Sequence, residues 1–144
     1  MRVSLAWFAL LAVAALPVIA GAQPAATDLS FTPAQVQSGQ AEYRASCNDC
    51  HGPHLDDGEF GGPPLIGAAF TAKWFKLPPS GLVNYIHGAM PPDSPGRLPL
   101  GTYVEIATYI LSMNGIKPGA REMPADIKAL AALHYPAAKS GLGQ

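Results

Sequence analysis

The sequence of 144 residues has few charges, few cysteines and no dense run of basic residues. Only 13% of the residues are charged, and 9 Lys and Arg against 10 Asp and Glu leave a formal net charge of −1. Without a basic patch the chain cannot bind a phosphate backbone, so nucleic acid is excluded as a partner. The hydrophobic share of 49% excludes a disordered chain and predicts one folded core.

Alternating apolar and polar runs of the kind that form paired strands are also missing, and no segment repeats. Helical signals are present instead: Thr32 is a predicted N-cap, Pro33 occupies the first helical position and Gln35 completes a capping box. The sequence predicts an all-α bundle of about five helices joined by long loops. The predicted helices cover residues 33–46, 68–77, 80–87, 100–114 and 124–133.

The amino terminus resembles a targeting segment. It has one cation at Arg2, a long apolar run and an Ala-Gly-Ala ending at Ala22. These features predict a signal peptide over residues 1–22, a linker over 23–31 and export to the periplasm. An uncleaved anchor is the alternative, since residues 3–22 are long enough to span a bilayer. Membrane association is expected only in that case.

Both cysteines lie in the segment Cys-Asn-Asp-Cys-His at residues 47–51. A disulfide between Cys47 and Cys50 would close too small a loop to stabilise the fold much. A thioredoxin-like pair opens a helix after a strand, whereas this pair follows a predicted helix. A zinc site needs four ligands, and the other histidines lack the paired spacing of such sites. The spacing C-x-x-C-H is instead that of c-type haem attachment, with His51 ligating the iron.

The sixth ligand of the iron then has five candidates: Met90, Met113, Met123, His54 and His87. Met90 is favoured, because it lies in a Pro-rich loop far enough along the chain to reach the opposite haem face. Its thioether also suits the raised potential of an electron carrier. His54 is too close to His51, Met113 is expected in a helix core, and Met123 only shares the Met-Pro dipeptide. His87 is the main rival.

These segments together resemble a class I monohaem cytochrome c of the small bacterial periplasmic type. The resemblance rests on Gly39 and Tyr43 in the first helix, the attachment motif, the Gly-Pro-x-Leu-x-Gly loop at 62–67, Met-Pro at Met90 and Ala-Thr-Tyr-Ile in the last core helix. It implies a cytochrome c domain over residues 32–115, wrapped around one covalent haem c. Residues 116–144 then form a C-terminal extension packed on or beside the domain.

The resemblance also implies residue roles. Cys47 and Cys50 would bind haem covalently, His51 and Met90 would be axial ligands, and the Pro63 carbonyl would accept a hydrogen bond from His51. Leu65 and Trp74 are expected to contact the haem plane and a propionate. Gly39 and Tyr43 would cross Ile106 and Tyr109.

The implied function is electron transfer by Fe(II)/Fe(III) cycling, without enzymatic activity. The donor would be a periplasmic dehydrogenase and the acceptor an oxidase or another cytochrome, because the extension is similar to that of dehydrogenase-associated, often quinoprotein-associated, cytochromes. One alternative is a permanent haem c subunit of such a dehydrogenase, which an exposed apolar face at Ile127, Leu130 and Leu133 would support. The other is a haem enzyme or gas sensor with an open sixth site.

Overall fold

The computed structural model describes residues 27–136 and shows six helices and no strand over that range. The helices are α1 (Pro33–Ser46), α2 (Asn48–His51), α3 (Ala68–Trp74), α4 (Pro79–Ala89), α5 (Leu100–Met113) and α6 (Ile127–Ala131). The predicted all-α class is therefore confirmed, and α2 is an additional single turn. The predicted signal peptide at 1–22, the first part of the linker (23–26) and the end of the extension (137–144) lie outside the described residues.

The α1 helix begins as its sequence predicts. Thr32 Oγ1 accepts from the Gln35 N–H and Gln35 Oε1 accepts from the Thr32 N–H, both at 3.2 Å, with Pro33 in the first turn. This reciprocal pairing satisfies two backbone donors that a helix start leaves without partners. The helix ends at Ser46, so the attachment motif that begins at Cys47 follows it directly.

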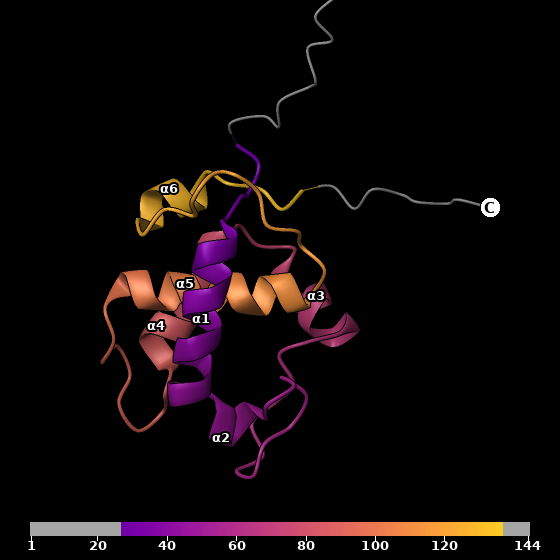
Figure 1. Ribbon diagram of the computed structural model, residues 1–144, viewed down its shortest axis with the longest axis vertical. Coiled ribbons are helices and arrows are strands. Elements are labelled where there is room, and N and C mark those ends of the chain that lie inside the picture. Colours follow the sequence, from indigo (N-terminus) through magenta and orange to yellow (C-terminus); the bar gives the residue numbers. More distant parts are fainter. Residues whose placement is uncertain (1–26, 137–144) are drawn as a thin grey trace, which may run out of the picture.

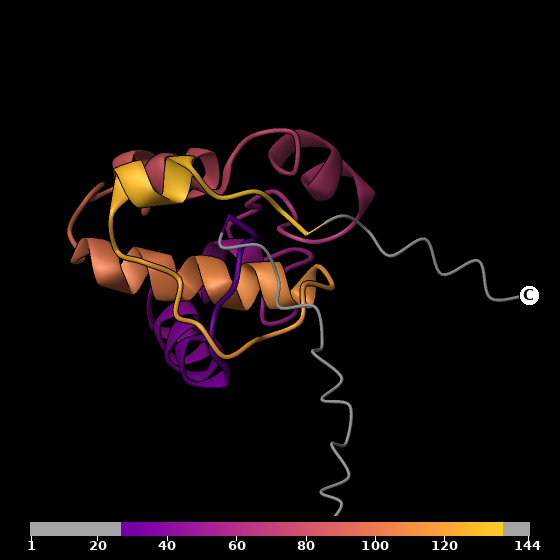
Figure 2. The same cartoon turned by 90° about the horizontal axis from the view of Figure 1, so that it is seen from above.

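The α5 helix is the centre of the molecule. It packs against α1 on one side and α4 on the other, and α6 lies beside α4 (Figure 1, Figure 2). From Tyr103 to Leu111 every residue of α5 except Glu105 is buried, as its apolar pattern predicts. Met113, expected in the core, is instead 49% exposed at the last position of α5.

Gly39 lies where α1 crosses α5. A Cβ at this position would overlap the carbonyl oxygen of Glu105, so the two helix backbones touch. Gly39 was expected to cross Ile106, and the atoms it meets there are backbone atoms of Glu105 and Ile106. One turn later, the rings of Tyr43 and Tyr109 pack with centroids 5.3 Å apart at 56°. This crossing ties the end of α1 to the central helix.

The other helices differ from their predicted ranges by a few residues. α3 ends at Trp74 and not at 77, and α4 starts at Pro79 and continues to Ala89. α6 is a short helix capped by Asp126, whose carboxylate accepts from the Ala129 N–H at 2.7 Å. None of the helices between residues 27 and 136 is both long enough and apolar enough to cross a bilayer.

Residues 116–136, here called the C-terminal strap, cross the side of the bundle away from α2 (Figure 1). Leu130 of α6 is fully buried against α4. The end of the strap pairs with the start of the described chain, where the Leu29 N–H donates to the His134 carbonyl at 2.8 Å. An exposed apolar face here would have supported the dehydrogenase-subunit alternative, but Leu130 is not exposed. Ile127 and Leu133 are half-buried against the core as well.

Candidate functional site

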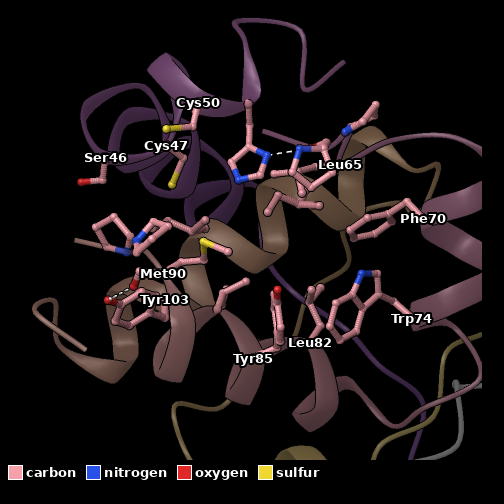
Figure 3. Close-up of a pocket in the computed structure, with 18 of the residues that line it drawn as sticks. Ser46, Cys47, Cys50, Leu65, Phe70, Trp74, Leu82, Tyr85, Met90 and Tyr103 are labelled. Carbon is pink, nitrogen blue, oxygen red and sulfur yellow. Dashed lines mark hydrogen bonds between the residues drawn. The ribbon is translucent and has the colours of Figure 1, made fainter. Parts of the chain in front are cut away.

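A cavity of about 300 Å³ lies between the α1–α2 junction, α3, α4 and α5. Its size is at the lower end of the roughly 300–1,000 Å³ found for cofactor pockets. Four side chains to which the sequence assigns attachment or ligation are in its wall: Cys47, Cys50, His51 and Met90. Cys47 and Cys50 lie at one end of the cavity and Trp74 at the other (Figure 3). The rest of the lining is largely aliphatic and aromatic.

The two cysteines are free thiols and both are half-buried. The single turn α2 places them and His51 on one side of the cavity, because the Cys50 and His51 N–H groups both bond the Cys47 carbonyl, at 3.2 and 3.0 Å. Burial raises the pKa of the Cys47 thiol to about 11, although nearby Arg97 lowers it. The thiol is therefore uncharged at neutral pH, as an apolar wall requires.

His51 is buried, and its ring is oriented by the loop that follows the motif. Nδ1 lies 2.7 Å from the Pro63 carbonyl oxygen. A carbonyl only accepts, so this contact requires the proton on Nδ1 and leaves the Nε2 lone pair available for a metal. The loop reaches this position because the Gly62 N–H donates to the Cys50 carbonyl at 2.7 Å. A Cβ at Gly62 would collide with that carbonyl.

Met90 is the C-cap of α4 and extends away from the helix with φ −127° and ψ 145°. Of the five candidates for the sixth ligand, all within the described residues, it is the one that lines the cavity. His87 packs edge-on against Tyr103 outside the lining, and His54 is exposed. Met123 is buried in the strap and Met113 is exposed. The geometry therefore separates Met90 from its rivals.

This set of groups fits a c-type haem. The cavity wall contains two thiols, one thioether and one imidazole, whose Nε2 is available because Nδ1 is hydrogen-bonded. The lining has few other polar groups. Residues 34–110, just over half of the chain, match the family model described as cytochrome C oxidase, cbb3-type, subunit III. The chain belongs to this family of cytochrome c domains. Comparisons with curated proteins and with solved structures found no match.

Membership confirms the predicted class I monohaem cytochrome c and its haem c cofactor. A cytochrome c domain transfers electrons through its haem, and its partners are redox proteins. Members of the family are typically electron carriers and are commonly found in the periplasm or outside the cell.

Leu65 and Trp74, for which haem contacts are expected, both line the cavity of this cytochrome c domain. Leu65 is half-buried, and its N–H donates to the Leu55 carbonyl at 2.7 Å. Trp74 is buried and packs against Tyr85, with ring centroids 5.1 Å apart. The Lys73 ammonium lies 4.6 Å from the Trp74 ring centroid, so a cation stands at this end of the cavity.

Much of the wall was not predicted. Phe70 was missed although it lies one turn before the predicted Trp74 on α3, and Leu82 and Ile86, also missed, lie one turn apart on α4. The spacing i, i+4 puts such pairs on one helix face, which is a usable sequence signal, but it does not say which core the face meets. Tyr103 of α5 was missed as well, and nothing in its neighbourhood singles it out.

Proposed function

We propose that this chain is a periplasmic electron carrier in which Cys47 and Cys50 hold haem c covalently and His51 and Met90 are the axial ligands of its iron. The observation that carries the proposal is that these four side chains line one apolar cavity. When bound, the haem supplies the one-electron Fe(II)/Fe(III) couple. Two axial ligands from the protein leave no position for a substrate, which favours a carrier over an enzyme or gas sensor.

The protein residues have defined tasks in this proposal. The Pro63 carbonyl holds the Nδ1 proton of His51, which fixes the tautomer and makes Nε2 a better donor. The Met90 thioether is a soft ligand that raises the reduction potential. The aliphatic and aromatic wall keeps water from the iron and lowers the local dielectric, which also tunes the potential.

The proposed donor is a periplasmic dehydrogenase and the proposed acceptor an oxidase or another cytochrome. The description of the matching family, which names an oxidase subunit, supports an oxidase as one redox partner of such domains. The attachment motif exposes the carboxylate of Asp49, and the loop after it exposes those of Asp56, Asp57 and Glu59. An acidic rim of this kind favours a partner with basic residues around its own docking face.

A free carrier is favoured over a permanent dehydrogenase subunit. An exposed apolar face in the C-terminal extension would have supported the subunit alternative, but α6 packs on α4 with Leu130 fully buried. Co-purification of a dehydrogenase at a stoichiometric ratio would support the subunit instead.

Export through cleavage of residues 1–22 belongs to the same proposal, with a linker over 23–31 and the cytochrome c domain over 32–115. The family's usual location outside the cytoplasm supports it. The mass of protein matured in a competent host tests this step. It should equal the chain from Gln23 onward plus one haem, and a mass that retains the first 22 residues would favour the anchor.

The deciding experiment compares wild type with Met90→Ala as haem-loaded proteins. A pyridine haemochrome spectrum should show haem in denatured wild type. Extraction with acid-acetone should leave this haem on the protein. Ferric wild type should have the far-red absorbance of iron–sulfur ligation, and Met90→Ala should lose it while its ferrous form gains rapid carbon monoxide binding. Met113→Ala, at an exposed position outside the cavity, is the matched control. Rapid carbon monoxide binding by wild type would refute the proposal.

A further inference from the structure

We propose that Tyr103 is a positioning residue that keeps Met90 on the iron by anchoring the backbone of the loop that carries it. The inference rests on the proposed function, because it takes Met90 as an axial ligand. The Tyr103 hydroxyl donates to the Met90 carbonyl oxygen at 2.7 Å (Figure 3). The Tyr103 side chain is 2% exposed, so the donor side of this hydrogen bond is shielded from water.

The Met90 carbonyl has few other donors within reach along the chain. Met90 is the C-cap that follows α4, and its N–H still bonds the Ile86 carbonyl at 3.0 Å while its own carbonyl leaves the helix. The next two residues, Pro91 and Pro92, have no N–H. A donor must therefore come from another element, and α5 supplies it through Tyr103.

Tyr103 is itself held firmly. The His87 ring, in the last turn of α4, packs edge-on against it with centroids 5.1 Å apart at 79°. Tyr103 thus joins the end of α4, the start of the Met90 loop and the central helix. The other side of α5 packs on α1, whose end carries the attachment motif. Through this chain of contacts, α5 sets the position of Met90 relative to His51.

The consequence concerns how often Met90 leaves the iron. An exogenous ligand binds ferric iron only in the fraction of molecules whose thioether has detached, so its apparent dissociation constant falls as that fraction rises. Removing the hydroxyl leaves the half-buried Met90 carbonyl without its donor while Met90 is bound, and this cost is relieved when the loop moves away. The detached fraction is expected to rise by about tenfold or more.

The experiment titrates the ferric, haem-loaded protein with imidazole at fixed pH and follows the far-red absorbance. Tyr103→Phe should keep this absorbance without imidazole, and its apparent dissociation constant should be about tenfold lower than that of wild type. Tyr109→Phe removes a hydroxyl from the same helix outside the cavity and is the matched control, expected within twofold of wild type. Replacing Tyr103 by 4-aminophenylalanine, which keeps a donor, should restore most of the wild-type value.

Two results would overturn the inference. One is a Tyr103→Phe value within twofold of wild type, and the other is an equal fall in Tyr109→Phe, which would indicate general loosening of the fold. If Tyr103→Phe does not fold, 4-aminophenylalanine and 4-methylphenylalanine at position 103 replace it, since they fill similar volumes with and without a donor. Equal apparent dissociation constants for imidazole in these two variants would also overturn the inference. Wild type without the far-red absorbance would refute Met90 ligation itself, and the inference with it.

Discussion

Gly39 is a position where one missing carbon atom allows two helices to touch. The site of a Cβ is occupied by the Glu105 carbonyl oxygen, and the Ile106 nitrogen lies 3.0 Å away. Backbone atoms of a buried helix cannot rotate aside, so Gly39→Ala is expected to lower the free energy of unfolding by about 2 kcal/mol or more. Thermal unfolding of the haem-loaded protein, followed by far-UV circular dichroism, measures this loss.

Gly101→Ala is the control for Gly39. A Cβ at Gly101 would lie 3.9 Å from the Ala125 Cβ, which is an ordinary contact. Helix propensity then dominates, and this variant is expected to match wild type or gain about 0.5 kcal/mol. An equal loss in both variants would contradict the close approach of α1 and α5.

Tyr135 provides a pH-dependent test at the residue scale. Burial raises its pKa to about 12, and its ring stacks on Phe75 at 4.4 Å. Because the fold favours the neutral phenol, the contribution of Tyr135 to the free energy of unfolding is complete below pH ~10, the pKa of an unfolded tyrosine. This contribution is lost as the pH rises towards 12. The hydroxyl has no hydrogen-bond partner among residues 27–136, so removing it breaks no such bond there.

Tyr135→Phe should therefore unfold less readily than wild type at alkaline pH. The difference in unfolding free energy is expected to grow between pH ~10 and ~12 to the order of 1 kcal/mol, after allowance for the partial exposure of the ring. Urea denaturation followed by far-UV circular dichroism measures it without depending on haem ligation. Parallel stability curves for the two proteins over this interval would show that Tyr135 does not titrate with unfolding.

At the scale of elements, Gln35 joins the start of α1 to the C-terminal strap. Its Oε1 accepts from the N–H groups of Thr32 and Met123, and its Nε2 donates to the Met123 carbonyl at 2.9 Å. Gln35→Ala is expected to cost about 1–3 kcal/mol of unfolding free energy, because it removes half of the capping box and leaves backbone groups without partners. Chemical denaturation of the haem-loaded protein measures the cost.

Gln37→Ala tests whether this cost is specific. Gln37 is exposed on the same helix, so its replacement is expected to change stability by less than about 0.5 kcal/mol. A loss as large as that of Gln35→Ala would mean that the cost does not come from the capping box and the link to the strap.

The ends of the helices show how far local signals extend. The capping box at Thr32 and Gln35 predicts the start of α1 correctly, because all of its atoms lie within four residues. α4 starts at Pro79, one residue earlier than predicted, since proline is accommodated in the first turn of a helix. Its continuation to Ala89 and the packing of α6 have no such local cause. They depend on burial against α5 and α4.

For the whole molecule, the cavity makes folding dependent on its cofactor. An empty apolar cavity of about 300 Å³ would cost on the order of 7 kcal/mol at ~24 cal/mol per Å³. A domain of this size is stable by only about 5–15 kcal/mol. Protein produced without haem attachment is therefore expected to lose cooperative thermal unfolding and near-UV circular dichroism. A sharp thermal transition close to that of the haem-loaded protein would contradict this.

The sequence alone determined what depends on neighbouring residues. Cys47, Cys50 and His51 lie within five residues, so their spacing predicts haem attachment before any fold is known. The helical periodicity predicts the all-α class. Tertiary structure decided the long-range partners. It placed Met90 and not His87 in the cavity wall, brought the Tyr103 hydroxyl to the Met90 carbonyl, and set the backbone of α5 against Gly39. These contacts arise from the packing of whole helices, to which many residues contribute weakly and none gives a local pattern.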